Sequence, residues 1–162
     1  MKHQLTPNAW SCVPTAVAIF LGKPVEWVIK QMGHDGSEEP FEDDRHKIAF
    51  HHQEFIDILW TYGYSCTPIE RFPATMPKAD GSVKSVPLKL VNWEEKDARL
   101  AHYLLHNDGI LTGTVTSTGA GHAATWDHEQ NTLHDPKNRS YKNEEIKRCD
   151  FQPQIFWIIT SR

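Results

Sequence analysis

The sequence predicts an α+β fold, with helices in the first part of the chain and an antiparallel sheet in the last third. An almost uninterrupted apolar run from Cys12 to Leu21 is typical of a helix that is buried on most sides. Helical periodicity continues to about Tyr62, whereas segments rich in β-branched residues, bounded by turn signals, begin at Ile110. A length of 162 residues suits one domain. We therefore expect a single domain over residues 1–162.

The first predicted helix begins at Cys12, with Ser11 as its expected N-cap. Pro14 lies in the first turn, where a backbone N–H has no intrahelical partner to lose, and Gly22 ends the helix. Unpaired N–H groups and the helix dipole stabilise a thiolate at such a position, where cysteine pKa values run from about 3.5 to 7.5. Cys12 is therefore a candidate nucleophile, although by itself it also fits a small core residue.

The other elements are predicted from periodicity and turn signals. The segment 35–44 is acidic and reads as a loop, either a solvated face or a selector of basic substrates. Prolines and an Asp-Gly turn signal leave little regular structure between 64 and 87. The expected helices are 25–33, 47–62 and 94–107, and the expected strands are 65–69, 88–91, 110–116, 122–127, 132–135 and 155–160.

Composition narrows the class of protein. The chain is 39% hydrophobic and 23% charged with a net charge of -4, and its Lys and Arg residues form no stripe, so we expect no nucleic-acid partner. No apolar run reaches the length of a membrane span and the N-terminus has no signal-peptide pattern, which predicts no membrane association and a cytoplasmic location. Cys12, Cys66 and Cys149 are an odd number without metal spacing, which argues against a disulfide framework or a zinc ribbon.

The histidines raise a metal hypothesis. His102 and His106 lie one helical turn apart, and His51 and His52 lie in the preceding predicted helix. A zinc site needs three or four converging ligands, and the hydrolytic zinc motif needs a glutamate directly after its first histidine, where this chain has Tyr103. We therefore predict neither a metal nor another cofactor.

A thiolate nucleophile needs a base beside it and a third group that orients the base. If Asp127 pairs with Gln130 in a two-residue hairpin, Asp135 lies directly opposite His122 on the same face of the sheet. Opposed residues have Cβ atoms about 4.5 to 5.5 Å apart, which suits a carboxylate that orients an imidazole. Gly121 would let a substrate approach closely. Singly, His122 also fits a structural histidine and Asp135 a turn residue.

Three stretches resemble the papain-like cysteine peptidases, most closely the branch that processes bacteriocin leaders and its bacterial and phage relatives: S-C-V-P-T-A at 11–16, G-H-A-A-T-W-D at 121–127 and H-D-P at 134–136. The resemblance implies Cys12 as nucleophile, His122 as general base and then acid, and Asp135 as the group that fixes the imidazole tautomer. It also implies a papain-like fold, in which a buried N-terminal helix packs on a C-terminal antiparallel sheet, and a peptide or protein substrate.

The same family places a glutamine before the cysteine, and its side-chain N–H joins the cysteine backbone N–H in the oxyanion hole. Gln4 is the only glutamine before Cys12, and it stands eight positions upstream, which departs from the family's spacing. Asn8 is the alternative, because the chemistry asks for an amide donor. Trp10, two residues before the cysteine, either lines the substrate pocket, which we favour, or covers the start of the helix.

These residues predict a thiol-dependent hydrolase that cleaves a peptide or isopeptide amide through a Cys12 thioester. Two alternatives remain open at the level of sequence. An amidase or a transglutaminase-like acyl transferase uses the same triad, because all of these reactions pass through a thioester. A papain-like binding or inhibitor module would keep the shape without turnover.

Overall fold

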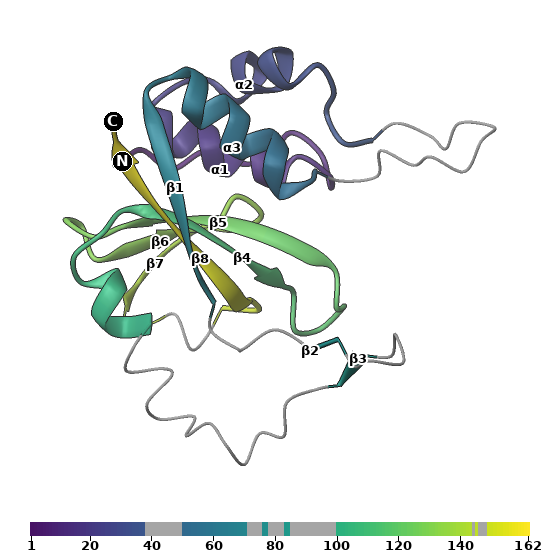
Figure 1. Ribbon diagram of the computed structural model, residues 1–162. Helices are drawn as coiled ribbons and strands as arrows, with labels where there is room; N and C mark the ends of the chain where they lie inside the picture. The colour runs from purple at the N-terminus through teal and green to yellow at the C-terminus, as the bar shows by residue number, and fades with distance from the viewer. Residues whose placement is uncertain (38–49, 71–75, 78–82, 85–99, 144, 146–148) are drawn as a thin grey trace.

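The computed structural model describes residues 1–37, 50–70, 76–77, 83–84, 100–143, 145 and 149–162. Three helices cover one face of a six-stranded antiparallel sheet (Figure 1), which confirms the predicted α+β class. The helices are α1 (Cys12–Leu21), α2 (Val25–Met32) and α3 (His52–Thr61).

The six strands lie in the order β1-β8-β4-β5-β6-β7, so the C-terminal strand is inserted between β1 and β4. A separate two-stranded pair is formed by β2 (Met76–Pro77) and β3 (Val83–Lys84). The strands of the large sheet are β1 (Tyr64–Glu70), β4 (Gly109–Thr114), β5 (Gly121–Asp127), β6 (Thr132–His134), β7 (Ser140–Lys142) and β8 (Gln152–Ser161).

Helix α1 is the centre of the helical layer, and its residues from Cys12 to Ile19 are all buried. It ends at Gly22, whose φ of 64° is left-handed and whose N–H bonds the carbonyls of Ala18 and Ile19. Ser11 occupies the N-cap position, as predicted, but its side chain makes no capping bond. The helix start is therefore held by other groups.

The sheet is buried on both faces because consecutive residues of its central strands are buried and point to opposite faces. Ala123 and Trp157 pack against the three helices, whereas Ala124 and Phe156 belong to a second cluster on the opposite face. The short helical turn 100–104 contributes Leu100 to that second cluster and lies below the sheet in Figure 1.

Several predicted boundaries shift. Helix α3 begins at His52 because His51 and Glu54 form a capping box ahead of it; residues 47–49 of the predicted helix lie outside the described part. The helix predicted over 94–107 is described only from Leu100, and it ends at residue 104. The strand predicted at 88–91 also lies outside the described residues. Strand β7 was not predicted, because three residues carry too little periodicity.

Among the described helices, none alone has the length and apolar character needed to cross a membrane. Taken together, α1 and α2 meet that test, but they are bent by 117° relative to each other.

Candidate active site

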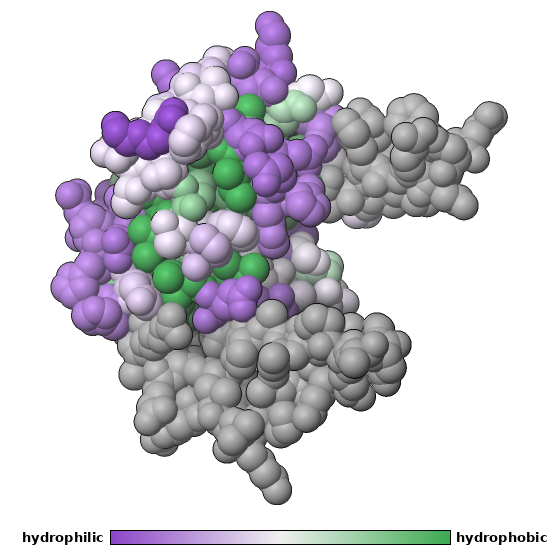
Figure 2. All heavy atoms as spheres, viewed as in Figure 1, coloured by the Kyte–Doolittle hydropathy of each residue, from purple (hydrophilic) through white to green (hydrophobic). Residues whose placement is uncertain are grey.

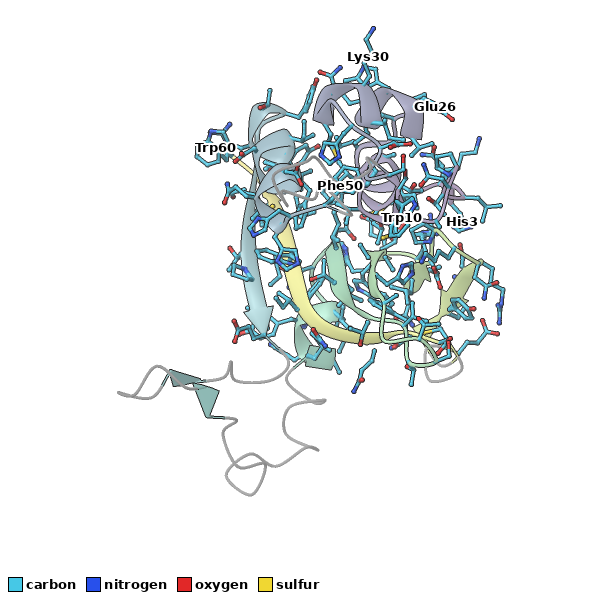
Figure 3. The ribbon with its side chains drawn as sticks, turned by 90° about the vertical axis from the view of Figure 1, so that its right-hand side faces the viewer. His3, Trp10, Glu26, Lys30, Phe50 and Trp60 are labelled. Atoms are coloured by element: carbon cyan, nitrogen blue, oxygen red, sulfur yellow. The ribbon has the colours of Figure 1, made fainter. Side chains whose placement is uncertain are left out.

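A cleft opens where the helical layer meets the sheet, and Cys12 at the start of α1 lines it. The Cys12 residue is 7% exposed, so its thiol is largely buried but borders the opening. Figure 3 shows Trp10 and Phe50 at this junction, and both line the cleft. Figure 2 shows the face turned by 90° from that of Figure 3, on which hydrophobic side chains gather in the middle with hydrophilic ones on either side. The sheet side of the cleft includes Gly121 and His122 from β5.

The hairpin between β5 and β6 differs from the prediction. Asp127 pairs with Thr132 rather than with Gln130, so the connection spans residues 128–131 and not two residues. The Asp127 side chain accepts a hydrogen bond from the Gln130 N–H inside this loop, which stabilises the longer turn. The predicted register was therefore wrong by two residues, although a shift of two keeps every side chain on the predicted face.

His122 and Asp135 meet despite this shift. His122 Nε2 donates to Asp135 Oδ1 at 2.8 Å, and both side chains are at least nine-tenths buried. In the observed register Asp135 follows His134, which pairs with Thr125, so Asp135 lies diagonally across from His122 and not directly opposite. Diagonal neighbours remain within reach of long side chains.

Cys12 approaches the end of β5 that β6 does not cover. Pairing of β6 with β5 begins at Thr125, and Cys12 and Ala123 belong to the same buried cluster on the helical side of the sheet. Burial raises the pKa of the Cys12 thiol, but the neighbouring imidazole of His122 outweighs it, helped by the Ala123 amide and the charge of Lys137. The pKa of Cys12 therefore lies below its ordinary value.

The imidazole of His122 is charged at neutral pH for the complementary reason. Burial lowers its pKa, but the hydrogen bond with Asp135, the neighbouring Cys12 thiol and the charges of both groups raise it to about 9. Burial also raises the pKa of Asp135, and the bond with His122 overcomes this, so the carboxyl pKa is lowered. Since Nε2 is held by Asp135, Nδ1 is the ring nitrogen left to face the sulfur, and it has no hydrogen-bond partner among the described residues.

The two amides predicted for the oxyanion hole are placed elsewhere. The Gln4 side chain donates to the Lys23 carbonyl at 2.8 Å, beyond the C-terminal end of α1, so the structure does not bring it to Cys12. The Asn8 amide nitrogen donates to Asp35 Oδ2 at 3.1 Å. Neither residue lines the cleft. The backbone N–H groups of Cys12 and Val13, in contrast, bond no acceptor among the described residues.

Asn8 instead fixes the turn that precedes the nucleophile. Its Oδ1 accepts from the N–H groups of Trp10 and Ser11 at 2.8 and 2.9 Å. The Ser11 hydroxyl lies within 2.9 Å of Asn8 Oδ1 and 2.8 Å of the Asp35 carbonyl oxygen. The structure thus places Asn8 at this turn and not in the cleft, beside Asp35, a partner that the sequence did not indicate because long-range loop contacts leave no periodic signal.

His34 holds the part of the cleft wall that Phe50 forms. Its Nδ1 accepts from the Gly36 N–H at 3.2 Å, so the hydrogen is on Nε2, which donates to Glu54 Oε1 at 2.7 Å. The ring stacks on Phe50, with ring centroids 4.4 Å apart. This contact holds Phe50, which the sequence placed in a helix, beside the cleft.

The other predicted residues lie as follows. Trp10 lines the cleft and is 45% exposed, which agrees with a pocket residue. Gly121 also lines it, and a Cβ added there would meet no atom within 4 Å. Lys137 lines the cleft too and was missed, because a lysine after a turn is ordinary in sequence.

The remaining cysteines differ from Cys12. Burial raises the pKa of Cys66 to about 11, and burial also raises that of Cys149. His102 and His106 contact each other on the 100–106 turn, with ring centroids 5.2 Å apart. Among the described residues, no group of three or more His, Cys, Asp or Glu side chains is arranged to hold a metal ion.

No protein-family model, no curated protein and no solved structure matches this chain.

Proposed function

We propose that this protein is a thiol-dependent hydrolase, a cysteine peptidase of papain-like architecture that cleaves a peptide or isopeptide amide. One observation carries the proposal: Cys12, at the start of a buried helix, and His122, far along the chain and bonded to Asp135, line the same cleft. The pKa of the thiol is lowered while that of the imidazole is raised to about 9, which favours a thiolate–imidazolium pair.

In the proposed reaction, the Cys12 thiolate attacks the amide carbonyl carbon and the carbonyl oxygen becomes an oxyanion. The proton on His122 Nδ1 passes to the leaving amine as the C–N bond breaks, which leaves a thioester on Cys12 and a neutral imidazole. Neutral Nδ1 then takes a proton from water, whose oxygen attacks the thioester. Collapse of this second intermediate releases the acid and restores the thiolate and the imidazolium.

The oxyanion is assigned to backbone donors. The N–H groups of Cys12 and Val13 are unpaired within the described residues and lie at the positive end of α1. Preorganised N–H donors of this kind stabilise the charge that develops on the oxygen. Asp135 remains ionised throughout and holds the ring through Nε2, because the pKa of its carboxyl is lowered by that bond.

Cleavage of a peptide library tests the proposal without a known substrate. Wild type, Cys12→Ala and His122→Ala are each incubated with a peptide mixture, and newly formed termini are identified by mass spectrometry. We expect new termini with wild type only. A matched control is Cys66→Ala, which removes a thiol whose pKa burial raises to about 11 and which should leave cleavage unchanged.

Adding a primary amine to the same reaction separates hydrolysis from acyl transfer. Products that carry the amine in place of a free carboxyl would favour an acyl transferase, since both reactions share the thioester. Identical termini from wild type and Cys12→Ala, or none from either, would contradict the hydrolase and favour a binding module.

A further inference from the structure

The cleft beside Cys12 carries positive charge. Lys137 lines it, and the Lys137 backbone N–H donates to Asp135 Oδ1 at 2.9 Å, which fixes this residue two positions after the orienting carboxylate. None of the described residues that line the cleft is acidic. The carboxylate of Asp135 is buried and already accepts bonds from His122 and from the Lys137 amide.

The Lys137 side chain is exposed, and it forms no ion pair with a described carboxylate. Its positive charge is one of the causes that lower the pKa of Cys12, the proposed nucleophile. The free N–H groups at the start of α1 add to the positive potential. The rest of the lining is mostly apolar, with Trp10, Val13 and Ile155 among its residues. The charge of His122 is matched by the Cys12 thiolate and Asp135, so an anion would find in Lys137 a cation that is unpaired among the described residues, in a weakly polar setting.

We infer that the cleft selects a substrate with a carboxylate beside the amide bond to be cleaved, and that Lys137 is the residue that binds this carboxylate. The inference rests on the proposed function, whose site it refines. An acidic side chain or a terminal carboxylate of a peptide would both fit. The acidic segment 35–44 had suggested the opposite charge preference; its residues 38–44 lie outside the described part, and Asp35 is bonded to Asn8 and Ser37.

Two small reagents test the charge preference directly. Iodoacetate and iodoacetamide alkylate the same sulfur, but only iodoacetate carries a negative charge. The rate constant for iodoacetate divided by that for iodoacetamide at Cys12 therefore measures how strongly the cleft attracts an anion. The ratio is independent of the fraction of thiolate, because both reagents need it. We expect Lys137→Gln to lower the ratio by about threefold to tenfold at low ionic strength. Lys137→Arg should retain the wild-type ratio.

The matched control is Lys30→Gln, which removes the same charge from α2, on the far side of the helical layer from the sheet (Figure 3). It should leave the ratio unchanged. An equal ratio in wild type and Lys137→Gln would overturn the inference while leaving the proposed hydrolase intact. Slow alkylation of Cys12 by iodoacetamide, no faster than that of Cys66, would contradict the hydrolase instead, and the ratio would still decide the role of Lys137.

The peptide library supplies a second readout. Peptides cleaved by the wild type should carry Asp, Glu or a free C-terminal carboxylate next to the broken bond. Lys137→Glu should shift cleavage towards sites with a neighbouring Lys or Arg, because the charge of the cleft is reversed. Cleavage sites with no acidic neighbour in wild type would count against the inference.

Discussion

At the level of a single residue, two opposing influences act on the pKa of Cys12. Burial favours the neutral thiol, whereas His122 favours the thiolate, and His122 prevails. Cys66 is only partly buried and has no such partner, and burial raises its pKa to about 11. The contrast attributes the special character of Cys12 to its neighbours and not to its depth in the protein.

Asp135→Asn tests how His122 is held. Asparagine keeps the size of the side chain but removes the charge that, with its hydrogen bond, raises the pKa of His122 to about 9. We expect that pKa to fall, and any cleavage activity to drop by about 10²-fold to 10⁴-fold, as for the equivalent change in a serine protease. An NMR titration of the imidazole measures the first effect. A His122 pKa that stays near 9 in the variant would show that Asp135 is not its main partner.

At the scale of elements, the site depends on where strands end. Strand β6 stops short of the start of β5, which leaves room for the beginning of α1 beside Ala123. Strand β4 has a register shift against β8 between Thr112 and Gly113, and both residues line the cleft. Bulges of this kind are common beside active sites because they redirect the chain.

Gly113 and Gly121 offer a matched pair of substitutions on the two strands of the cleft. A Cβ at Gly113 would lie 2.1 Å from the Gln152 carbonyl oxygen, whereas one at Gly121 would meet nothing within 4 Å. We expect Gly113→Ala to lower the free energy of unfolding by about 3 kcal/mol or more and Gly121→Ala to change it by less than about 0.5 kcal/mol. Urea unfolding measures both, and equal effects would mean that β8 does not approach Gly113 so closely.

The sequence was informative where a pattern is local. The apolar run of α1, its glycine stop and the turn signal before β5 predicted those elements, and Cys12 at the helix start followed from them. The face of Asp135 was predicted correctly, but its register was not, since a four-residue loop and a two-residue loop place it on the same face.

Contacts between loops left no local pattern in the sequence. The Gln4 prediction failed because a spacing along the chain does not reveal that its amide reaches the Lys23 carbonyl. The tasks of Asn8 and Lys137 also depend on partners from distant or irregular segments. Sequence patterns identify which residue types are present near a motif, but the fold decides which way they face.

Across the whole molecule, the buried ionisable groups determine how stability depends on pH. Cys12 and His122 act in opposite directions: the raised pKa of His122 adds stability that is lost as the pH rises from 6.5 towards about 9, whereas the lowered pKa of Cys12 adds stability that is gained as the pH rises towards 9.0. His134 acts differently. Burial lowers its pKa below 6.5, and the charge of Asp127 only partly opposes this.

The unfolded chain binds a proton at His134 more readily than the folded chain does. The contribution of His134 to the free energy of unfolding is therefore fully present above pH 6.5 and is lost as the pH falls below that value. His134→Gln should weaken this loss, with part of it retained because burial also lowers the pKa of His52. Urea midpoints at pH 7.5 and 5.5 measure the effect, and the exposed His106→Gln is the control. An equal decrease of the urea midpoint from pH 7.5 to 5.5 in wild type and His134→Gln would refute this assignment.

The central claim is that the sulfur of Cys12 is activated by the imidazole of His122. The most direct measurement is the pH dependence of iodoacetamide alkylation, mapped to each cysteine by mass spectrometry, in wild type and in His122→Gln. We expect Cys12 to react with a midpoint below 9.0, the ordinary thiol value, and Cys66 with one near 11. In His122→Gln the Cys12 midpoint should rise above 9.0, because burial would then prevail. A Cys12 midpoint that matches Cys66, or one that His122→Gln leaves unchanged, would contradict the claim.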